Sequence, residues 1–151
     1  LRFNGPHGGF YLREDSKKPM ILLAGGTGFA PIKAIVEHTI AEQCRRPMHI
    51  YWGAKARADL YQNSLPERWA AENANITYIP VLSEPAADDR WSGRTGFVHQ
   101  AVMADFPDLS GHQVYACGAP VMIDAARSDF VGICKLPEEE FFADAFSFST
   151  T

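Results

Sequence analysis

Short apolar runs alternate with stretches of helical periodicity along most of the chain. Residues 20–24 are continuously apolar, which is typical of a parallel strand that is covered on both faces. A helix is predicted next, because apolar positions and one threonine recur at spacings of three and four: Ile32, Ile35, Val36, Thr39 and Ile40. The same patterns predict further elements. The strands span residues 48–52, 76–82, 114–117 and 140–146, and the helices span 59–71, 97–106 and 120–133.

Strands that alternate with helices imply right-handed crossovers and a parallel sheet. We therefore predict an α/β fold of the Rossmann type, with a doubly wound five-stranded parallel sheet flanked by helices. Such sheets bind ligands beyond the carboxyl ends of their strands, where the strand order reverses. Four predicted strands end in small, polar or proline-marked turns, which are residues 25–28, 53–55, 83–85 and 117–120. The sequence therefore predicts a binding site along one edge of the sheet.

The turn after the first strand has the composition of a phosphate-binding loop. Gly25, Gly26, Thr27 and Gly28 allow the backbone N–H groups to approach a ligand closely, and Pro31 suits the first turn of the following helix. The turn is not the usual dinucleotide fingerprint, because Pro31 takes the third small position, and no Gly-Lys-Ser/Thr follows as in a P-loop. Read alone, the turn also fits a glycine-rich loop without a ligand.

Composition narrows the class of protein. The chain has 151 residues, of which 46% are hydrophobic and 21% charged, as expected of one domain with a core. The net charge of -4 and pI near 5.7 argue against nucleic acid as the main partner. Neither the three cysteines nor the five histidines show the spacing of a disulfide framework or a metal site. No signal peptide or membrane span is predicted, so we expect a cytoplasmic protein.

The first residues have the character of a domain end. The chain begins inside a strand pattern without Met and turns at residues 5–9 before the pattern resumes. We expect a piece of a longer protein, with residues 1–18 as the tail of a preceding domain and its connection, and residues 19–151 as a nucleotide-binding domain. The basic pair Lys17 and Lys18 is interpreted as a solvated turn.

Five motifs together carry a resemblance to a known family. In chain order they are GPHGGFYL, AGGTGFAP, YWGAK with DLY, WSGRTGFV and YACGAPVM. The set resembles the NAD(P)H-binding domain of the ferredoxin-NADP reductase superfamily, in particular bacterial reductases that serve oxygenases and deoxysugar-forming enzymes. The resemblance covers essentially the whole chain. It implies that a flavin domain, and in many members a [2Fe-2S] domain, belong to the same polypeptide.

The resemblance also implies roles for single residues. The Gly25–Gly28 turn would lie under the pyrophosphate, and Cys117, Gly118, Pro120 and Met122 would lie beside the nicotinamide. The Cys117 thiol would be near the carbon that gives hydride to flavin N5, although a lone cysteine is commonly a small buried hydrophobe. The terminal aromatic of the family corresponds to Phe146, near the flavin ring, with Asp144 beside it.

The second and third strand ends bear on the choice between NADH and NADPH. A 2′-phosphate is usually bound by Arg or Lys, and a free ribose diol by a carboxylate. After Gly53 the sequence offers both kinds, Lys55 and Arg57 against Asp59, and the third strand ends at Ser83 and Glu84. The family resemblance favours NADH. Lys55 and Arg57 fit equally well as the solvated entry to a helix.

The predicted function is the NAD(P)H-binding domain of a flavin-dependent reductase, which delivers hydride from NADH to FAD for onward one-electron transfer through an iron-sulfur centre. The chain lacks a flavin-binding Arg-x-Tyr-Ser pattern and a cysteine-rich iron-sulfur loop, so FAD and [2Fe-2S] are assigned to other domains, and this piece alone is not expected to turn over. The alternative is a nicotinamide-nucleotide-binding regulatory or docking module without hydride transfer.

Overall fold

The structure is a computed structural model that describes residues 17–25, 29–60, 63–91 and 93–145. Several sequence-based predictions lie outside the described residues and stay predictions. They concern the turn at residues 5–9, the roles of Gly26, Thr27 and Gly28 in the glycine turn, the side chain of Asp144, and Phe146.

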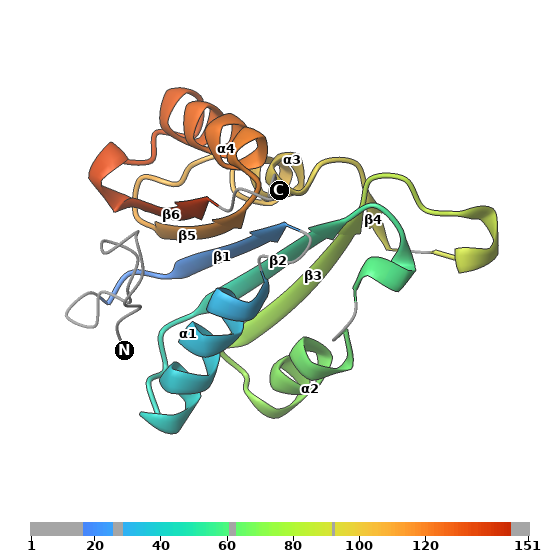
Figure 1. Cartoon of the computed structure of the whole chain (residues 1–151). Helices are drawn as coiled ribbons and strands as arrows, with labels where there is room; N and C mark the ends of the chain where they lie inside the picture. The colour runs from blue at the N-terminus through green and yellow to red at the C-terminus, as the bar shows by residue number, and fades with distance from the viewer. Residues whose placement is uncertain (1–16, 26–28, 61–62, 92, 146–151) are drawn as a thin grey trace.

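The described residues form one parallel sheet of six strands in the order β4-β3-β2-β1-β5-β6 (Figure 1). The strands are β1 (Met20–Gly25), β2 (Met48–Ala54), β3 (Ile76–Leu82), β4 (Arg94–Thr95), β5 (Gln113–Gly118) and β6 (Phe141–Ala145). The helices are α1 (Phe29–Ala41), α2 (Ser64–Glu72), α3 (Val98–Asp105) and α4 (Pro120–Gly132), with short 3-10 helices η2 (Arg57–Asp59), η3 (Ala87–Asp89) and η4 (Glu138–Glu140). The predicted α/β class with a doubly wound sheet is confirmed.

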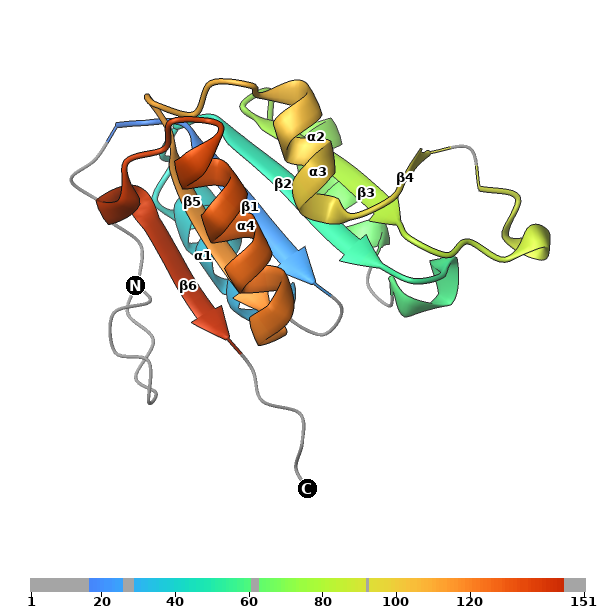
Figure 2. The same cartoon turned by 90° about the horizontal axis from the view of Figure 1, so that it is seen from above.

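Helices cover both faces of the sheet. Met20, Leu22 and Ala24 of β1 pack in a core with α1 and α2, whereas Ile21 and Leu23 pack in a second core with α3 and α4. Figure 2 shows α3 and α4 together in front of the sheet. Because both faces of β1 are buried, every side chain from Met20 to Ala24 must be apolar, which is the pattern seen in the sequence.

The predicted number of five strands is wrong. The sixth strand, β4, pairs with the end of β3 through Val81–Arg94 and Leu82–Thr95. It was missed because β4 is two residues long, and an alternation of apolar and polar positions cannot be recognised over two residues.

The helix predicted over residues 59–71 is wrong at its start. The segment begins with η2, and α2 itself begins only at Ser64. Pro66 is the third residue of α2, and a proline is tolerated only in the first turn of a helix because it has no N–H to donate. The helix therefore starts close to Pro66, and Leu65 in its first turn is only partly buried.

The strand ends that carry the glycine turns lie at one edge of the sheet. Gly25 pairs with Gly53, and Ala24 pairs with Cys117, so the carboxyl ends of β1, β2 and β5 are level. The strand order reverses between β1 and β5, since β2, β3 and β4 lie on one side of β1 and β5 and β6 on the other. A ligand site is expected at this carboxyl edge.

Candidate functional site

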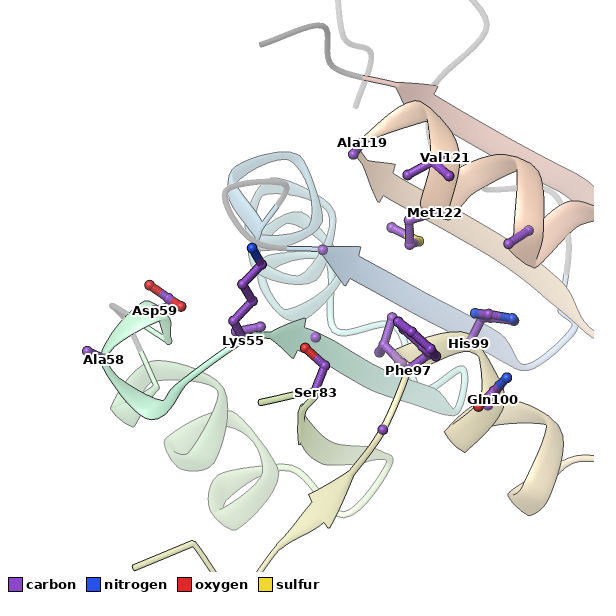
Figure 3. Close-up of a pocket in the computed structure, with 16 residues that line it drawn as sticks. Lys55, Ala58, Asp59, Ser83, Phe97, His99, Gln100, Ala119, Val121 and Met122 are labelled. Carbon is purple, nitrogen blue, oxygen red and sulfur yellow. The ribbon is translucent and has the colours of Figure 1, made fainter. Parts of the chain in front are cut away.

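A cavity of about 870 Å³ opens at the carboxyl edge. Its walls come from the ends of β1, β2 and β3, from η2, from the turn before α3 and from the first turns of α3 and α4 (Figure 3). This volume is within the range of small-molecule and cofactor sites. Position and size together mark it as the candidate binding site.

One wall of the cavity is polar. Lys55, Asp59 and Ser83 line it and lie on the same side in Figure 3. Asp59 accepts a hydrogen bond from the backbone N–H of Ala56 at 3.2 Å, which holds its carboxylate against η2. The backbone of Ser83 donates to the Ala54 carbonyl at 2.9 Å and so continues the end of β2. This wall offers a ligand one cation, one carboxylate and one hydroxyl.

The opposite wall is apolar. Phe97 precedes α3 and is 63% exposed, and Val121 in the first turn of α4 is 76% exposed. Both line the cavity with Met122 (Figure 3). Val98 lines it as well. Large apolar side chains that stay exposed in a cavity are typical of a surface that binds a ring system or another protein segment.

Glycines allow the closest packing at this edge. A Cβ on Gly25 would lie 2.9 Å from the Met122 methyl carbon, and one on Gly118 would lie 2.7 Å from the same atom and 3.3 Å from the Gly25 backbone. A Cβ on Gly53 would lie 2.6 Å from Cβ of Val98. Glycine at these strand ends therefore lets α3 and α4 approach β1, β2 and β5.

The turn between β4 and α3 is held by a polar cluster behind the cavity wall. The Asp105 carboxylate accepts from the Tyr51 hydroxyl at 2.6 Å and from Arg94 at 3.0 Å, and Arg94 also donates to the Ala101 carbonyl. Burial works to raise the pKa of the Asp105 carboxyl, but the hydrogen bonds from Arg94 and Tyr51 outweigh it and hold the pKa below its usual value. In the same turn Gly96 has φ of 105°, a backbone conformation that favours glycine.

His99 connects the two helices that border the apolar wall. Its ring lines the cavity and is almost fully buried, and Nε2 lies 3.1 Å from the Asp129 carboxylate on α4. This contact between α3 and α4 fixes the spacing of the apolar wall.

The structure brings together six of the residues predicted for the site. Those that line the cavity are Gly25, Gly53, Lys55, Asp59, Ser83 and Met122. The described residues that were predicted but do not line it are Pro31, Arg57, Glu84, Cys117, Gly118 and Pro120. Cys117 is fully buried in the core on the α1 side, and the Arg57 guanidinium lies 5.9 Å from the centre of the Trp91 ring.

Sequence reasoning missed the segment from Gly96 to Gln100, which lines the cavity throughout. The motif WSGRTGFV was recognised as part of the family resemblance, but none of its residues from Gly96 to Val98 was given a role. The signal that could have found it was Gly96, because a glycine just after a parallel strand is typical of the carboxyl edge, where ligands bind. The strand before it was too short to be recognised.

Within the described residues, no helix is both long and apolar enough to cross a membrane. Nor do the described His, Cys, Asp and Glu side chains form a group of three or more that could hold a metal ion.

Residues 22–128 match the family model described as Oxidoreductase NAD-binding domain. Protein RfbI of Salmonella typhimurium is 50% identical over 149 residues, which are 99% of this chain and 44% of RfbI. The CDP-6-deoxy-L-threo-D-glycero-4-hexulose-3-dehydrase reductase of Yersinia pestis is 51% identical over 97% of this chain and 43% of that protein. The NAD(P)H-flavin reductase of Aliivibrio fischeri is 38% identical over 98% of this chain and 61% of its own length.

Among solved structures, the cytochrome P450 reductase GcoB of Amycolatopsis is similar with a TM-score of 0.83 and 31% identity, over 94% of this chain and 42% of that one. The predicted resemblance to the ferredoxin-NADP reductase superfamily is confirmed. The chain spans less than half the length of RfbI and of the Yersinia reductase.

Proposed function

Because the chain belongs to the oxidoreductase NAD-binding domain family, we propose that it is the NADH-binding domain of a flavin-dependent reductase. In this proposal it delivers hydride from NADH to FAD on a preceding domain, and electrons leave singly through a [2Fe-2S] centre to a redox acceptor. The observation that carries the proposal is the cavity at the reversal of strand order, with a polar wall facing an apolar one.

The chemistry of the two walls fits a dinucleotide. Lys55, Asp59 and Ser83 supply the charge and the hydrogen bonds that ribose and phosphate require, and Phe97 and Val121 supply apolar surface for a ring. When bound, the nicotinamide nucleotide supplies the hydride, and the protein supplies binding and orientation.

We assign the pyrophosphate to the end of β1, where Gly25 would contact it together with Gly26, Thr27 and Gly28 of the glycine turn. The nicotinamide end is assigned to the turn between β5 and α4, with Gly118, Pro120 and Met122. Met122 supports this assignment, since it lines the cavity and its methyl group lies against both Gly25 and Gly118. Cys117 would act by packing beneath that turn, because its side chain is fully buried.

We propose NADH rather than NADPH as the preferred donor. Asp59 lines the cavity and would accept hydrogen bonds from a free ribose diol, whereas its charge would repel a 2′-phosphate. Arg57 supports the same choice, because its guanidinium lies over the Trp91 ring and is not part of the cavity wall. Lys55 is part of the polar wall and would bind a phosphate of either nucleotide.

The relatives support the wider proposal. Proteins named as reductases match nearly the whole chain, and the chain spans 43% of the length of one and 61% of another. The remainder of a longer polypeptide would hold the flavin and, by the same analogy, the iron-sulfur centre. We keep the division into a preceding domain and its connection over residues 1–18 and the nucleotide-binding domain over residues 19–151 as part of this proposal.

The test is anaerobic flavin reduction in the full-length polypeptide. NADH added to the oxidised protein should bleach the flavin absorbance in a rapid-mixing experiment, with a dissociation constant at least tenfold lower than that of NADPH, or ~1.4 kcal/mol. The variant Lys55→Met should weaken both nucleotides, and Arg68→Met on the exposed side of α2 is the matched control.

Two results would contradict the proposal. NADH that binds without bleaching the flavin favours the alternative, a nucleotide-binding module without hydride transfer. Tighter binding of NADPH than of NADH would reject the assigned role of Asp59 while leaving the reductase proposal intact.

A further inference from the structure

A closed ring of hydrogen bonds lies at the opposite, amino-terminal edge of the sheet. Arg46 donates to the Gln113 side-chain oxygen at 2.8 Å, and Gln113 donates to Glu140 at 2.7 Å. Lys18 donates to the other Glu140 oxygen at 2.8 Å, and Arg46 Nε donates to the Lys18 carbonyl at 3.0 Å, which closes the ring. We call these four residues, Lys18, Arg46, Gln113 and Glu140, the amino-edge ring.

The amino-edge ring joins four separate segments. Its members come from the chain that enters β1, the loop before β2, the first residue of β5, and η4. Arg46 and Gln113 are 7% and 4% exposed. A planar guanidinium can donate in two fixed directions at once, which suits a residue that connects two segments.

The cost of burying these groups is not offset by any role in the cavity. Met20 of β1 pairs with Met48 and Gln113, so the ring lies where the strands begin, a full strand length from the carboxyl edge. Buried charged groups are weak evidence for stability, since apolar residues often do as well, and they are better explained where they fix one arrangement of segments.

The arrangement fixed here is that of the chain entering the domain. Besides the bond from Arg46, the backbone N–H of Gln113 donates to the Pro19 carbonyl at 3.0 Å, and Met20 donates to the Pro47 carbonyl at 2.8 Å. Lys17 is exposed, as expected of a solvated turn, whereas the Lys18 side chain is 38% exposed and its ammonium group pairs with Glu140. Just before β1, the chain is therefore held by hydrogen bonds to its backbone and to the Lys18 side chain.

We infer that the amino-edge ring is a positioning device for the connection to the preceding domain, and that it sets the orientation in which the two domains meet. The inference rests on the proposed function, in which residues before Pro19 lead to a flavin domain. Hydride transfer needs the reacting atoms within about 3–3.5 Å, and a misplacement of about 1 Å can cost a hundredfold in rate. A loose connection would therefore slow the transfer without changing the nucleotide site.

The experiment uses the full-length reductase and the variants Arg46→Met and Lys18→Met. Their matched controls are the exposed neighbours, Arg45→Met and Lys17→Met, which lose the same charge from the adjacent position. Rapid-mixing flavin reduction at a series of NADH concentrations gives the limiting hydride-transfer rate and the dissociation constant separately. Thermal unfolding of each variant is recorded in parallel.

We expect the limiting rate of Arg46→Met to fall at least tenfold, and that of Lys18→Met about threefold, while the NADH dissociation constant stays within twofold of the parent. Both controls should keep the parent rate. An unchanged limiting rate in Lys18→Met and Arg46→Met, with only a lower unfolding temperature, would overturn the inference, as would a rate change matched by the controls.

Failure of the proposed function has a different signature. If the parent protein itself shows no flavin reduction by NADH, the proposed function fails and the inference falls with it. Should Arg46→Met not fold, Lys18→Met decides, because it removes one exposed-side contact and leaves the buried Arg46–Gln113 bond in place.

Discussion

The two edges of the sheet are built in opposite ways. At the carboxyl edge, glycines at the ends of β1, β2 and β5 let helices pack closely around a cavity, and Phe97 and Val121 stay exposed beside it. At the amino edge, the buried side chains of Arg46 and Gln113 and the partly exposed side chains of Lys18 and Glu140 bond to one another. The polar groups at the carboxyl edge face a cavity where a ligand can bind them, whereas those of the amino-edge ring are hydrogen-bonded to one another.

Because of this difference, substitutions at the two edges should change different properties of the protein. A substitution at the carboxyl edge should act mainly on nucleotide affinity, because the residues there face a cavity. A substitution at the amino edge should act on stability or on the geometry between domains, because its polar groups already have partners. The comparison fails if an amino-edge substitution weakens nucleotide binding, or if a carboxyl-edge substitution leaves nucleotide binding unchanged.

The largest expected effect is on stability at the amino edge. Gln113→Leu removes the centre of the amino-edge ring, so the buried Arg46 and Tyr115 side chains and the partly exposed Glu140 lose that partner. The free energy of unfolding should fall by about 3 kcal/mol, the order of loss when one member of a buried charged network is removed. Urea denaturation measures it. A simultaneous rise of more than twofold in the NADH dissociation constant would contradict the separation of the two edges.

The next effect is at the carboxyl edge. Gly118→Val should displace Met122 and press on the Gly25 backbone, since a Cβ there would lie 2.7 Å from one and 3.3 Å from the other. We expect a loss of about 2 kcal/mol in stability from overpacking. Binding of NADH should weaken at least tenfold, or ~1.4 kcal/mol.

For Gly118→Val, NADH titration measures the loss of affinity, and urea denaturation of the same samples measures the loss of stability. Gly111→Val is the matched control, because no heavy atom lies within 4 Å of the Cβ that would be added there. Normal affinity in Gly118→Val would remove the end of β5 from the proposed site.

A smaller effect is expected on nucleotide preference. Asp59→Ala removes the carboxylate of the polar wall, so the ratio of the NADPH to the NADH dissociation constant should fall about fivefold, or ~1 kcal/mol. Parallel titrations with both nucleotides measure this ratio. Glu84→Ala, at an exposed residue outside the cavity lining, is the control and should leave the ratio unchanged. An equal change in both variants would show a general charge effect.

The smallest effect is the response to acid, which should come from the amino edge. Burial lowers the pKa of His49, with a further contribution from His112, and burial also lowers the pKa of His112. Asp105 acts to raise the pKa of His49, and Asp108 acts to raise that of His112, but burial outweighs both. The Phe106 ring lies against both histidines.

Because both pKa values are lowered in the folded protein, these two histidines take up protons more readily in the unfolded chain as the pH falls below the ordinary histidine pKa of 6.5. The free energy of unfolding therefore falls as the pH is lowered through this range. The unfolding temperature should be lower at pH 5.5 than at pH 7.5, and the double variant His49→Gln, His112→Gln should show a smaller difference. An identical pH dependence in the double variant would assign the acid response to other groups.

The order of elements could be predicted from the sequence because each of those elements is long enough to show its own periodicity. The run at residues 20–24 predicted a strand buried on both faces, and Ile32, Ile35 and Val36 predicted the buried side of α1. The edge that carries the cavity was also predictable, since parallel strands place their carboxyl ends together. The motifs added the family, which composition and periodicity alone do not identify.

Tertiary structure decided the features that depend on residues far apart in the chain. β4 exists because β3 offers it a partner, and the segment that follows it becomes a cavity wall only when α3 packs on β2. Lys18 and Glu140 are separated by 122 positions, so no local pattern could indicate that they pair. Periodicity reports how each element meets the core, whereas polar contacts between distant segments are set by the three-dimensional arrangement of the elements.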